Sequence, residues 1–188
     1  MSDTQAIDAR LEICYDNTMI ITSGADGSFK LQTGGITLMT EGAGSEKSRM
    51  KPDIFLRMAR NDMETPEAGF TVKGAGEYEI QGVEIRGTEP FTYFLKAEDL
   101  RLAVLSSADV KALESLTNID IAIVPDDVAI EGMGRFLRQL EPKMIIAAEK
   151  VSELIHKDLG LAIDRTEKIT VKRKDIPSTG MTLSCLTA

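Results

Sequence analysis

The stretch Gly74-Ala-Gly-Glu-Tyr-Glu-Ile-Gln-Gly-Val-Glu-Ile-Arg-Gly87 is the starting point for predicting the fold of this 188-residue chain. Its aromatic and β-branched side chains alternate with charged ones, as in strands with one buried face: Tyr78, Ile80, Val83 and Ile85. Gln81-Gly82 separates the two runs and supplies the turn of a hairpin. The remaining glycines suit bulges, turns or close sheet packing. We therefore interpret the stretch as structural and not catalytic.

Composition limits the classes of function. The net charge is −8, which disfavours non-specific attraction to nucleic acid or to anionic lipid. Aromatic residues make up 5 % of the chain and Trp is absent, which argues against base-stacking surfaces. No apolar run approaches the ~20 residues of a membrane helix, and residues 1–9 lack a signal pattern. We expect a cytoplasmic protein that binds neither nucleic acid nor membranes.

The first half of the chain is rich in strand patterns, and its strands are separated by turn residues. We expect strands at 11–15, 19–22, 29–32, 36–40, 54–58, 70–73, 92–97 and 100–105. The first four of these predict an antiparallel meander, and the last two predict a hairpin across Glu98-Asp99. The segments 41–51 and 59–66 are polar and predict loops.

The second half alternates helix and strand patterns. Helices are predicted at 107–116, from Asp126-Asp127 to Leu140, and at 151–159 before Gly160. Continuous apolar runs at 119–124 and 144–148 predict strands buried on both faces, and two further strands close the chain between 169 and 186. No linker separates the halves. We expect a tail at 1–9 and a single layered α/β domain at 10–188.

The glycine-rich stretch resembles the Gly-Pro-Gly-Glu-Tyr-Glu-Val-x-Gly-Val element of small bacterial metallo-β-lactamase-fold hydrolases. Further stretches are similar to that family in order and spacing: 29–31, 35–40, 52–56, 100–105, 119–125, 139–146 and 169–177. The resemblance covers roughly residues 19 to 186. It implies a four-layer αββα sandwich with a zinc site at one sheet edge.

The sequence departs from the family where the metal ligands are expected. The family's His-x-His-x-Asp-His run is replaced by Ala59, Asn61, Met63 and Glu64, with Asp62 between them. Ser107 stands in place of the bridging Asp, and Glu149 in place of the last His. The family's Gly-His-Ser-Cys-Phe turn corresponds to residues 25–29, which include Asp26.

Zinc chemistry is therefore not expected. A dinuclear zinc site needs several imidazole ligands, but His156 is the only histidine and lies in a predicted helix. We interpret it as a surface or capping residue near the helix C-terminus. No catalytic residue and no cofactor is assigned to the degenerate cleft positions Ala59, Asn61, Asp62, Glu64, Ser107 and Glu149.

Three further groups of residues could have a chemical or a structural role. Oxygen ligands suit Mg²⁺, Ca²⁺ or Mn²⁺, so Asp26, Asp62, Glu64 and Glu149 are hard-cation candidates, but we favour a solvated acidic rim. Asp126-Asp127 is either a catalytic pair or a helix cap, and we favour the cap. Cys14 and Cys185 are interpreted as buried thiols, with a disulfide left open.

The leading hypothesis is a non-catalytic protein of this fold that acts as a structural or protein-interaction module. A homodimer is expected, because twofold symmetry is the commonest arrangement of soluble oligomers. One alternative is a hydrolase with an oxygen-ligated or metal-free site that uses Asp26, Asn61, Asp62, Glu64 or Glu149. Another is a small-ligand binding module in the old cleft.

Overall fold

The computed structural model describes residues 18–42, 50–59, 65–109, 117–126 and 131–188, and structural statements below concern these residues. Several sequence predictions lie outside them: the tail, the strand at 11–15 with Cys14, most of the helix at 107–116, and the residues Asn61, Asp62, Met63, Glu64 and Asp127.

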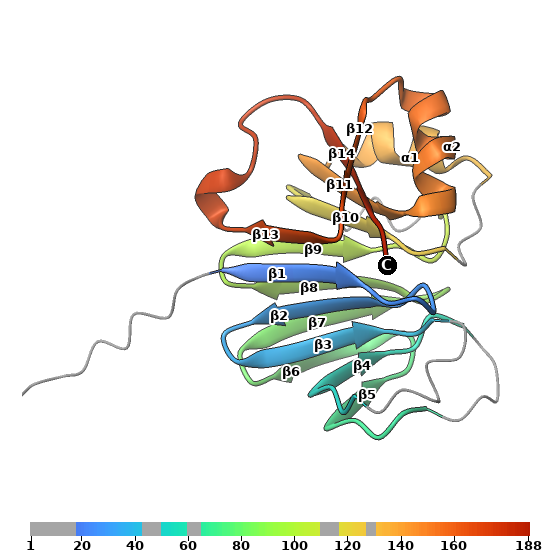
Figure 1. The fold of residues 1–188 in the computed structure, drawn as a ribbon. Coiled ribbons are helices and arrows are strands. Elements are labelled where there is room, and N and C mark those ends of the chain that lie inside the picture. The colour runs from blue at the N-terminus through green and yellow to red at the C-terminus, as the bar shows by residue number, and fades with distance from the viewer. Residues whose placement is uncertain (1–17, 43–49, 60–64, 110–116, 127–130) are drawn as a thin grey trace, which may run out of the picture.

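Two β-sheets pack face to face (Figure 1). Sheet A has the spatial order β13 (Lys168–Val171), β1 (Met19–Ser23), β2 (Phe29–Thr33), β3 (Ile36–Thr40), β4 (Ile54–Leu56) and β5 (Phe70–Val72). Sheet B has the order β12 (Ile163–Thr166), β14 (Thr182–Leu186), β11 (Met144–Ala148), β10 (Ile121–Val124), β9 (Leu100–Val104), β8 (Thr92–Ala97), β7 (Val83–Thr88) and β6 (Gly76–Ile80). Sheet B is antiparallel from β6 to β9 and parallel from β9 to β12.

The main core lies between the sheets and follows the period-2 alternation of the strands. In β1, for example, Met19 and Ile21 are buried in this core, while the residues between and after them are less buried. A second core lies between the parallel half of sheet B and the helices α1 (Met133–Leu140) and α2 (Glu149–Leu159). Strand β10 contributes to both cores and is buried throughout, as predicted for a strand covered on both faces.

The predicted α/β sandwich is therefore confirmed, with one qualification about its layers. Both α-helices of the described residues cover sheet B, beside β10, β11, β12 and β14 (Figure 1). Within the described residues, no helix lies on the outer face of sheet A. No helix of the described part of the chain is long and apolar enough to cross a membrane.

The hairpin predictions are confirmed because they depend on local turn chemistry. Gln81 and Gly82 have φ values of 51° and 84°, and Glu98 and Asp99 have values of 50° and 60°. Two successive residues with positive φ give a turn whose twist matches that of the flanking strands. The hairpins β6–β7 and β8–β9 consequently have the predicted register. The antiparallel pairing of β1, β2 and β3 is also as predicted.

The start of α1 differs from the prediction. The helix begins at Met133 with Gly132 as its N-cap, so Asp126 lies too early in the chain to cap it. Gly132 has a φ of 79°, a left-handed conformation that a glycine adopts at low cost. The N-cap prediction for Asp126 was therefore wrong.

Smaller differences concern elements with weak or truncated patterns. Strand β12 and the 3₁₀ helix η3 (Arg173–Asp175) were not predicted. The strand predicted at 54–58 ends at Leu56, and the strand predicted at 119–124 begins at Ile121. Cys185 is buried in β14, in agreement with its prediction as a buried thiol.

Candidate functional site

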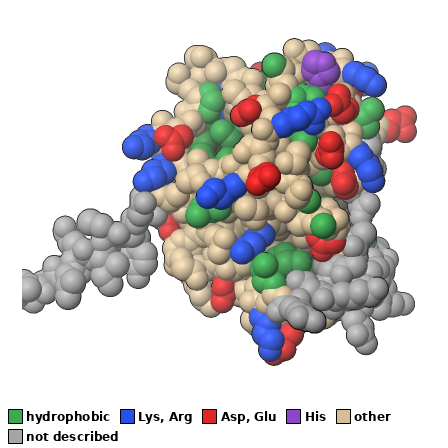
Figure 2. Space-filling model, in the orientation of Figure 1, with side chains coloured by type: hydrophobic (Ala, Val, Ile, Leu, Met, Phe, Trp, Pro, Cys, Tyr) green, Lys and Arg blue, Asp and Glu red, His purple; other side chains and the backbone are tan. Residues whose placement is uncertain are grey.

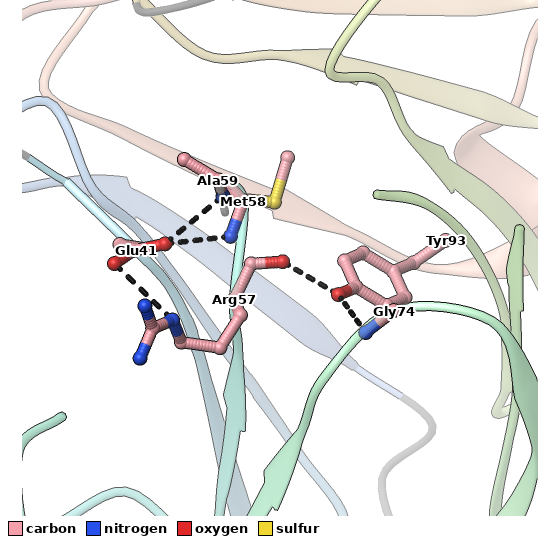
Figure 3. A network of polar contacts seen from close by, with 6 residues as sticks. All are labelled: Glu41, Arg57, Met58, Ala59, Gly74 and Tyr93. Atoms are coloured by element: carbon pink, nitrogen blue, oxygen red, sulfur yellow. Dashed lines mark hydrogen bonds and ion pairs between the residues drawn. The ribbon is translucent and has the colours of Figure 1, made fainter. Parts of the chain in front are cut away.

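The candidate site lies at the carboxyl ends of β4, β9, β10 and β11, where the family resemblance places metal ligands. The end of β4 is organised by the carboxylate of Glu41, which follows β3 directly (Figure 3). Its Oε2 accepts hydrogen bonds from the backbone N–H groups of Met58 at 2.8 Å and Ala59 at 3.1 Å. Its Oε1 lies 3.4 Å from Nε of Arg57, and both side chains are 10 % exposed. The carboxylate thus holds residues 58 and 59, at the start of the stretch where the family has its histidine run.

Tyr93 of β8 binds the same segment from the other sheet (Figure 3). Its hydroxyl donates to the carbonyl of Arg57 at 2.5 Å and accepts from the N–H of Gly74 at 3.0 Å. The side chain is 0 % exposed. Burial raises the pKa of Tyr93 to about 12, and the negative charge of Glu41 adds to this shift, because both disfavour the phenolate. Tyr93 is therefore a neutral structural bridge at physiological pH.

The glycine-rich stretch explains why this bridge can form. Gly87 pairs with Gly76 on one side and with Tyr93 on the other. A Cβ at Gly87 would lie 2.0 Å from the carbonyl oxygen of Gly74 and 3.2 Å from the Tyr93 ring. Gly74 has a φ of 86°, which allows its N–H to reach the Tyr93 hydroxyl. The structural interpretation of the stretch is thus supported by a specific close approach of backbone segments.

Asp26 is engaged locally and not directed at an open site. Its Oδ1 accepts hydrogen bonds from the Ser28 backbone N–H at 3.1 Å and the Ser28 hydroxyl at 2.6 Å. This is a local turn of the kind that Asp commonly forms. The backbone of Gly42 packs closely against the same loop, because a Cβ at Gly42 would lie 2.5 Å from the Ser28 nitrogen.

Asp126 and Ser107 carry unused hydrogen-bonding capacity. They follow the neighbouring parallel strands β10 and β9, whose ends are further linked by a bond from the Leu105 N–H to the Ile123 carbonyl. Oδ1 of Asp126 and Oγ of Ser107 are both buried and have no hydrogen-bond partner among the described residues. The Asp126 side chain also lies against the turn that contains Asp26, since a Cβ at Gly27 would be 3.6 Å from Cβ of Asp126. Buried polar atoms without partners are unusual enough to require an explanation.

The remaining candidate residues do not form a set of metal ligands at this edge. Glu149 is exposed in the first turn of α2, where a negative charge is favourable. His156 lies in the last turn of α2, and its Nδ1 is 2.7 Å from the carbonyl oxygen of Leu161. This placement agrees with the prediction for His156 near a helix C-terminus. Ala59 is present at the end of β4 but has no ligating side chain.

The available donors do not fit a zinc site of the family type. Glu41 and Asp26 already accept protein hydrogen bonds, Ala59 cannot ligate, and His156 is held by the Leu161 carbonyl. The described residues contain no group of three or more His, Cys, Asp or Glu side chains that could hold a metal ion. We therefore derive no chemical step through a metal.

Sequence reasoning did not identify Glu41 and Tyr93 as the residues that organise this edge. The available signal was the position of Glu41, an acid directly after the strand predicted at 36–40, together with the basic Arg57 near the end of the strand predicted at 54–58. The contacts themselves join segments that are 17 and 36 residues apart in sequence.

Comparison with known proteins agrees with this architecture. No protein-family model matches the chain, and no curated protein does. A structure from Thermotoga maritima, assigned to the Zn-dependent hydrolases of the metallo-β-lactamase superfamily, matches with a TM-score of 0.71 at 18 % identity, over 90 % of this chain and 100 % of the other. This chain has the metallo-β-lactamase fold.

Two further structures support the same fold. One from Parabacteroides distasonis, assigned to the metal-dependent hydrolases, has a TM-score of 0.55 at 17 % identity, over 75 % of this chain and 88 % of that one. A metallo hydrolase from the archaeon Ignicoccus hospitalis has a TM-score of 0.53 at 8 % identity, over 82 % of this chain and 99 % of that one. At these identities the metallo-β-lactamase fold is shared, and the activity of each neighbour remains a property of that neighbour.

Proposed function

We propose that this protein is a non-catalytic member of the metallo-β-lactamase fold that serves as a structural or protein-interaction module. The observation that carries the proposal is the network at the end of β4. There the Glu41 carboxylate accepts from the Met58 and Ala59 N–H groups and pairs with Arg57. One oxygen of this carboxylate binds two backbone N–H groups and the other pairs with the Arg57 guanidinium, where a hydrolase of this fold would present metal ligands.

The side chains at the same edge support the proposal. A zinc hydrolase uses the metal to lower the pKa of a bound water, and this requires a ligand set with an open position. Ala59 offers no donor, and the single imidazole of the chain is on α2, where its Nδ1 contacts the Leu161 carbonyl. The Tyr93 bridge also ties the end of β4 to the glycine-rich stretch, which favours a rigid edge.

Metal content together with activity tests the proposal. Purified protein is incubated with excess Zn²⁺ or Mn²⁺, desalted, analysed for bound metal, and assayed with phosphoester and lactone substrates. We expect less than stoichiometric metal and no metal-dependent turnover. Stoichiometric metal accompanied by hydrolysis would falsify the proposal.

A matched variant shows that the assay can detect a site in this scaffold. The quadruple variant Ala59→His, Asn61→His, Met63→Asp and Glu64→His writes the family's ligand run at the equivalent positions. We expect this variant to retain more metal than the natural chain after desalting. Such a gain would establish that the natural residues, and not the accessibility of the edge, limit binding.

A second candidate function is favoured by the unpartnered atoms at the ends of β9 and β10. Oδ1 of Asp126 and Oγ of Ser107 are oxygen donors of the kind that hard cations and polar ligands engage. If the edge binds Mg²⁺, Mn²⁺ or Ca²⁺, the ion should raise the melting temperature through mass action. The isosteric Asp126→Asn variant should then lose that increase. No increase with any of the three ions in the natural chain argues against an oxygen-ligated site.

A further inference from the structure

On the outer face of the antiparallel half of sheet B, the core that contains α1 and α2 extends to Phe94 of β8 and Ala103 of β9, while the charged residues of β6 to β9 are exposed beside it. Helices α1 and α2 cover the strands on the far side of β9, whereas the β6–β9 part forms a groove of about 750 Å³. Alternation places Ile80, Val83, Leu95 and Leu102 in the core between the sheets. The residues that alternate with them therefore point outward from β6–β9.

The outward residues form two rows across the four strands, because directly paired residues share a face. The first row, which we call the charge row, follows the register Glu79–Glu84–Lys96–Arg101 from β6 to β9. The second row follows Glu77–Arg86–Phe94–Ala103 in the same order. The charge row thus reads negative, negative, positive, positive.

The charged side chains of this row are exposed to solvent, and ion pairs between described residues neutralise only some of them. Lys96 Nζ lies 2.6 Å from Glu84 Oε1, and these side chains are 52 % and 60 % exposed. Glu79 and Arg101, at the two ends of the row, are also exposed, and neither side chain forms an ion pair with a described residue. By contrast, acidic and basic side chains are interspersed over the face drawn in Figure 2.

A row with this order is complementary to itself. A twofold axis parallel to the strands, between β7 and β8 and above the face, places β6 of one copy over β9 of the other. Glu79 then faces Arg101 of the second copy, and Glu84 faces Lys96 of the second copy. Stacked sheets lie about 10 Å apart, a gap that opposed Glu and Arg side chains can bridge.

Pairing of the two copies through the edge strand is disfavoured by the same residues. Glu77 and Glu79 are both exposed on β6, the terminal strand of sheet B among the described residues. An antiparallel β6–β6 pair would place these acids beside those of the other copy, and like charges opposite one another are destabilising. Charged edge strands are a common protection against edge-to-edge association.

We propose that the outer face of β6–β9 is the homodimer interface of this protein. The charge rows of the two copies run in opposite directions, so that the acidic end of each row faces the basic end of the other. The inference rests on the proposed function as an interaction module and identifies the partner as a second copy of this chain. The interface is isologous, as closed twofold assembly requires.

Charge reversal tests the geometry of this interface. The full-length chain, of 20.5 kDa, is examined by sedimentation equilibrium at low salt, where we expect a dimer. Glu79→Arg and Arg101→Glu each convert two attractive contacts into repulsive ones and should raise the dimer Kd about 10-fold or more. Mixing the two variants should restore the dimer, because each Glu79→Arg chain then meets an Arg101→Glu chain with both contacts attractive.

The restoration on mixing separates a lost interface from a lost fold, since two unfolded variants cannot complement each other. The matched controls are Glu67→Arg and Lys51→Glu, which reverse an ion pair of 2.5 Å whose side chains are 75 % and 67 % exposed, outside the β6–β9 face. These should leave the Kd unchanged. A natural chain that is monomeric at all concentrations would overturn the inference, and so would a dimer unaffected by both reversals on the face.

This outcome is independent of the metal test. A dimer that behaves as expected while metal-dependent hydrolysis is found would leave the interface in place and remove the non-catalytic function. A monomer without metal-dependent activity would remove the proposed interface and leave the non-catalytic function in place. Both readouts are made on the same preparation of the full chain.

Discussion

The ends of β4 and of β9–β10 lie at the same edge of the sandwich but use their polar groups differently. At the end of β4, the Glu41 carboxylate and the Tyr93 hydroxyl bind the backbone of residues 57–59 and of Gly74. At the ends of β9 and β10, Oγ of Ser107 and Oδ1 of Asp126 are buried and have no hydrogen-bond partner in the described part of the chain. A satisfied buried group stabilises the fold and an unsatisfied one costs free energy. The polar groups of the first region therefore stabilise the fold, and those of the second do not.

The close approach of Gly87 to Gly74 is expected to be the most sensitive point of the first region. Gly87→Ala places a methyl group 2.0 Å from a backbone oxygen, which no rotamer change can relieve. We expect a loss of about 3 kcal/mol or more in the free energy of unfolding, or failure to accumulate as soluble protein. Urea denaturation measures the loss. Gly82→Ala is the control, because nothing lies within 4 Å of its Cβ and only its φ of 84° costs about 1 kcal/mol.

Removal of the Tyr93 hydroxyl tests the bridge from the glycine-rich stretch to β4. Tyr93→Phe keeps the ring but leaves the Gly74 N–H and the Arg57 carbonyl without this partner. We expect a loss of about 3 kcal/mol in the free energy of unfolding, since each buried group left unsatisfied costs ~1–3 kcal/mol. A change below about 0.5 kcal/mol in urea denaturation would show that the bridge is dispensable.

Alkaline pH should weaken the same bridge. The pKa of Tyr93 is about 12 in the folded protein and 10 in the unfolded chain, so between these values only the unfolded chain releases the proton. The stabilisation is complete below pH 10 and is lost as pH rises to 12, at about 1.4 kcal/mol per pH unit. The measurement is the difference in slope between the natural chain and Tyr93→Phe over this interval. Parallel slopes would contradict the assigned pKa.

The Glu41 carboxylate should contribute slightly less to the free energy of unfolding than the Tyr93 hydroxyl. Glu41→Gln keeps the shape but replaces charge-assisted hydrogen bonds by neutral ones and removes the ion pair with Arg57. We expect a loss of about 2 kcal/mol in the free energy of unfolding. Glu67→Gln is the matched control, because Glu67 forms an exposed ion pair worth ~0–1 kcal/mol. Equal effects of the two substitutions would remove the distinction between Glu41 and a surface acid.

The smallest effect is expected in the second region. Asp126→Asn changes an oxygen without a hydrogen-bond partner among the residues that the structure describes, so we expect the free energy of unfolding to change by less than about 0.5 kcal/mol or to rise. Urea denaturation without added ligand checks this. A loss of more than about 2 kcal/mol would mean that Asp126 is as structural as Glu41 and would remove the contrast between the two ends.

The elements that were predicted correctly are those with strong local signals. The hairpin at 76–88 has alternating side chains and a Gln81-Gly82 turn, and α2 ends at Gly160, whose φ is 71°. Strand β12 was missed because it has four residues, two of them exposed and charged, and pairs only with β14. The cap at Asp126 was wrong because helix propensity and a suitable acid do not determine where a helix begins when a glycine six residues later supplies the turn.

Periodicity, turn residues and the presence of a single histidine are properties of the chain, and they predict a layered α/β domain that is poor in imidazole ligands. The family resemblance adds the two stacked sheets. Three features become visible in the folded chain alone. Glu41 contacts the end of β4, polar atoms of Asp126 and Ser107 are buried with no hydrogen-bond partner among the described residues, and four strands align their charges as negative, negative, positive, positive. The physical reason is that hydrogen bonds and strand register join residues distant in sequence. Their spacing is set by packing and not by any local pattern.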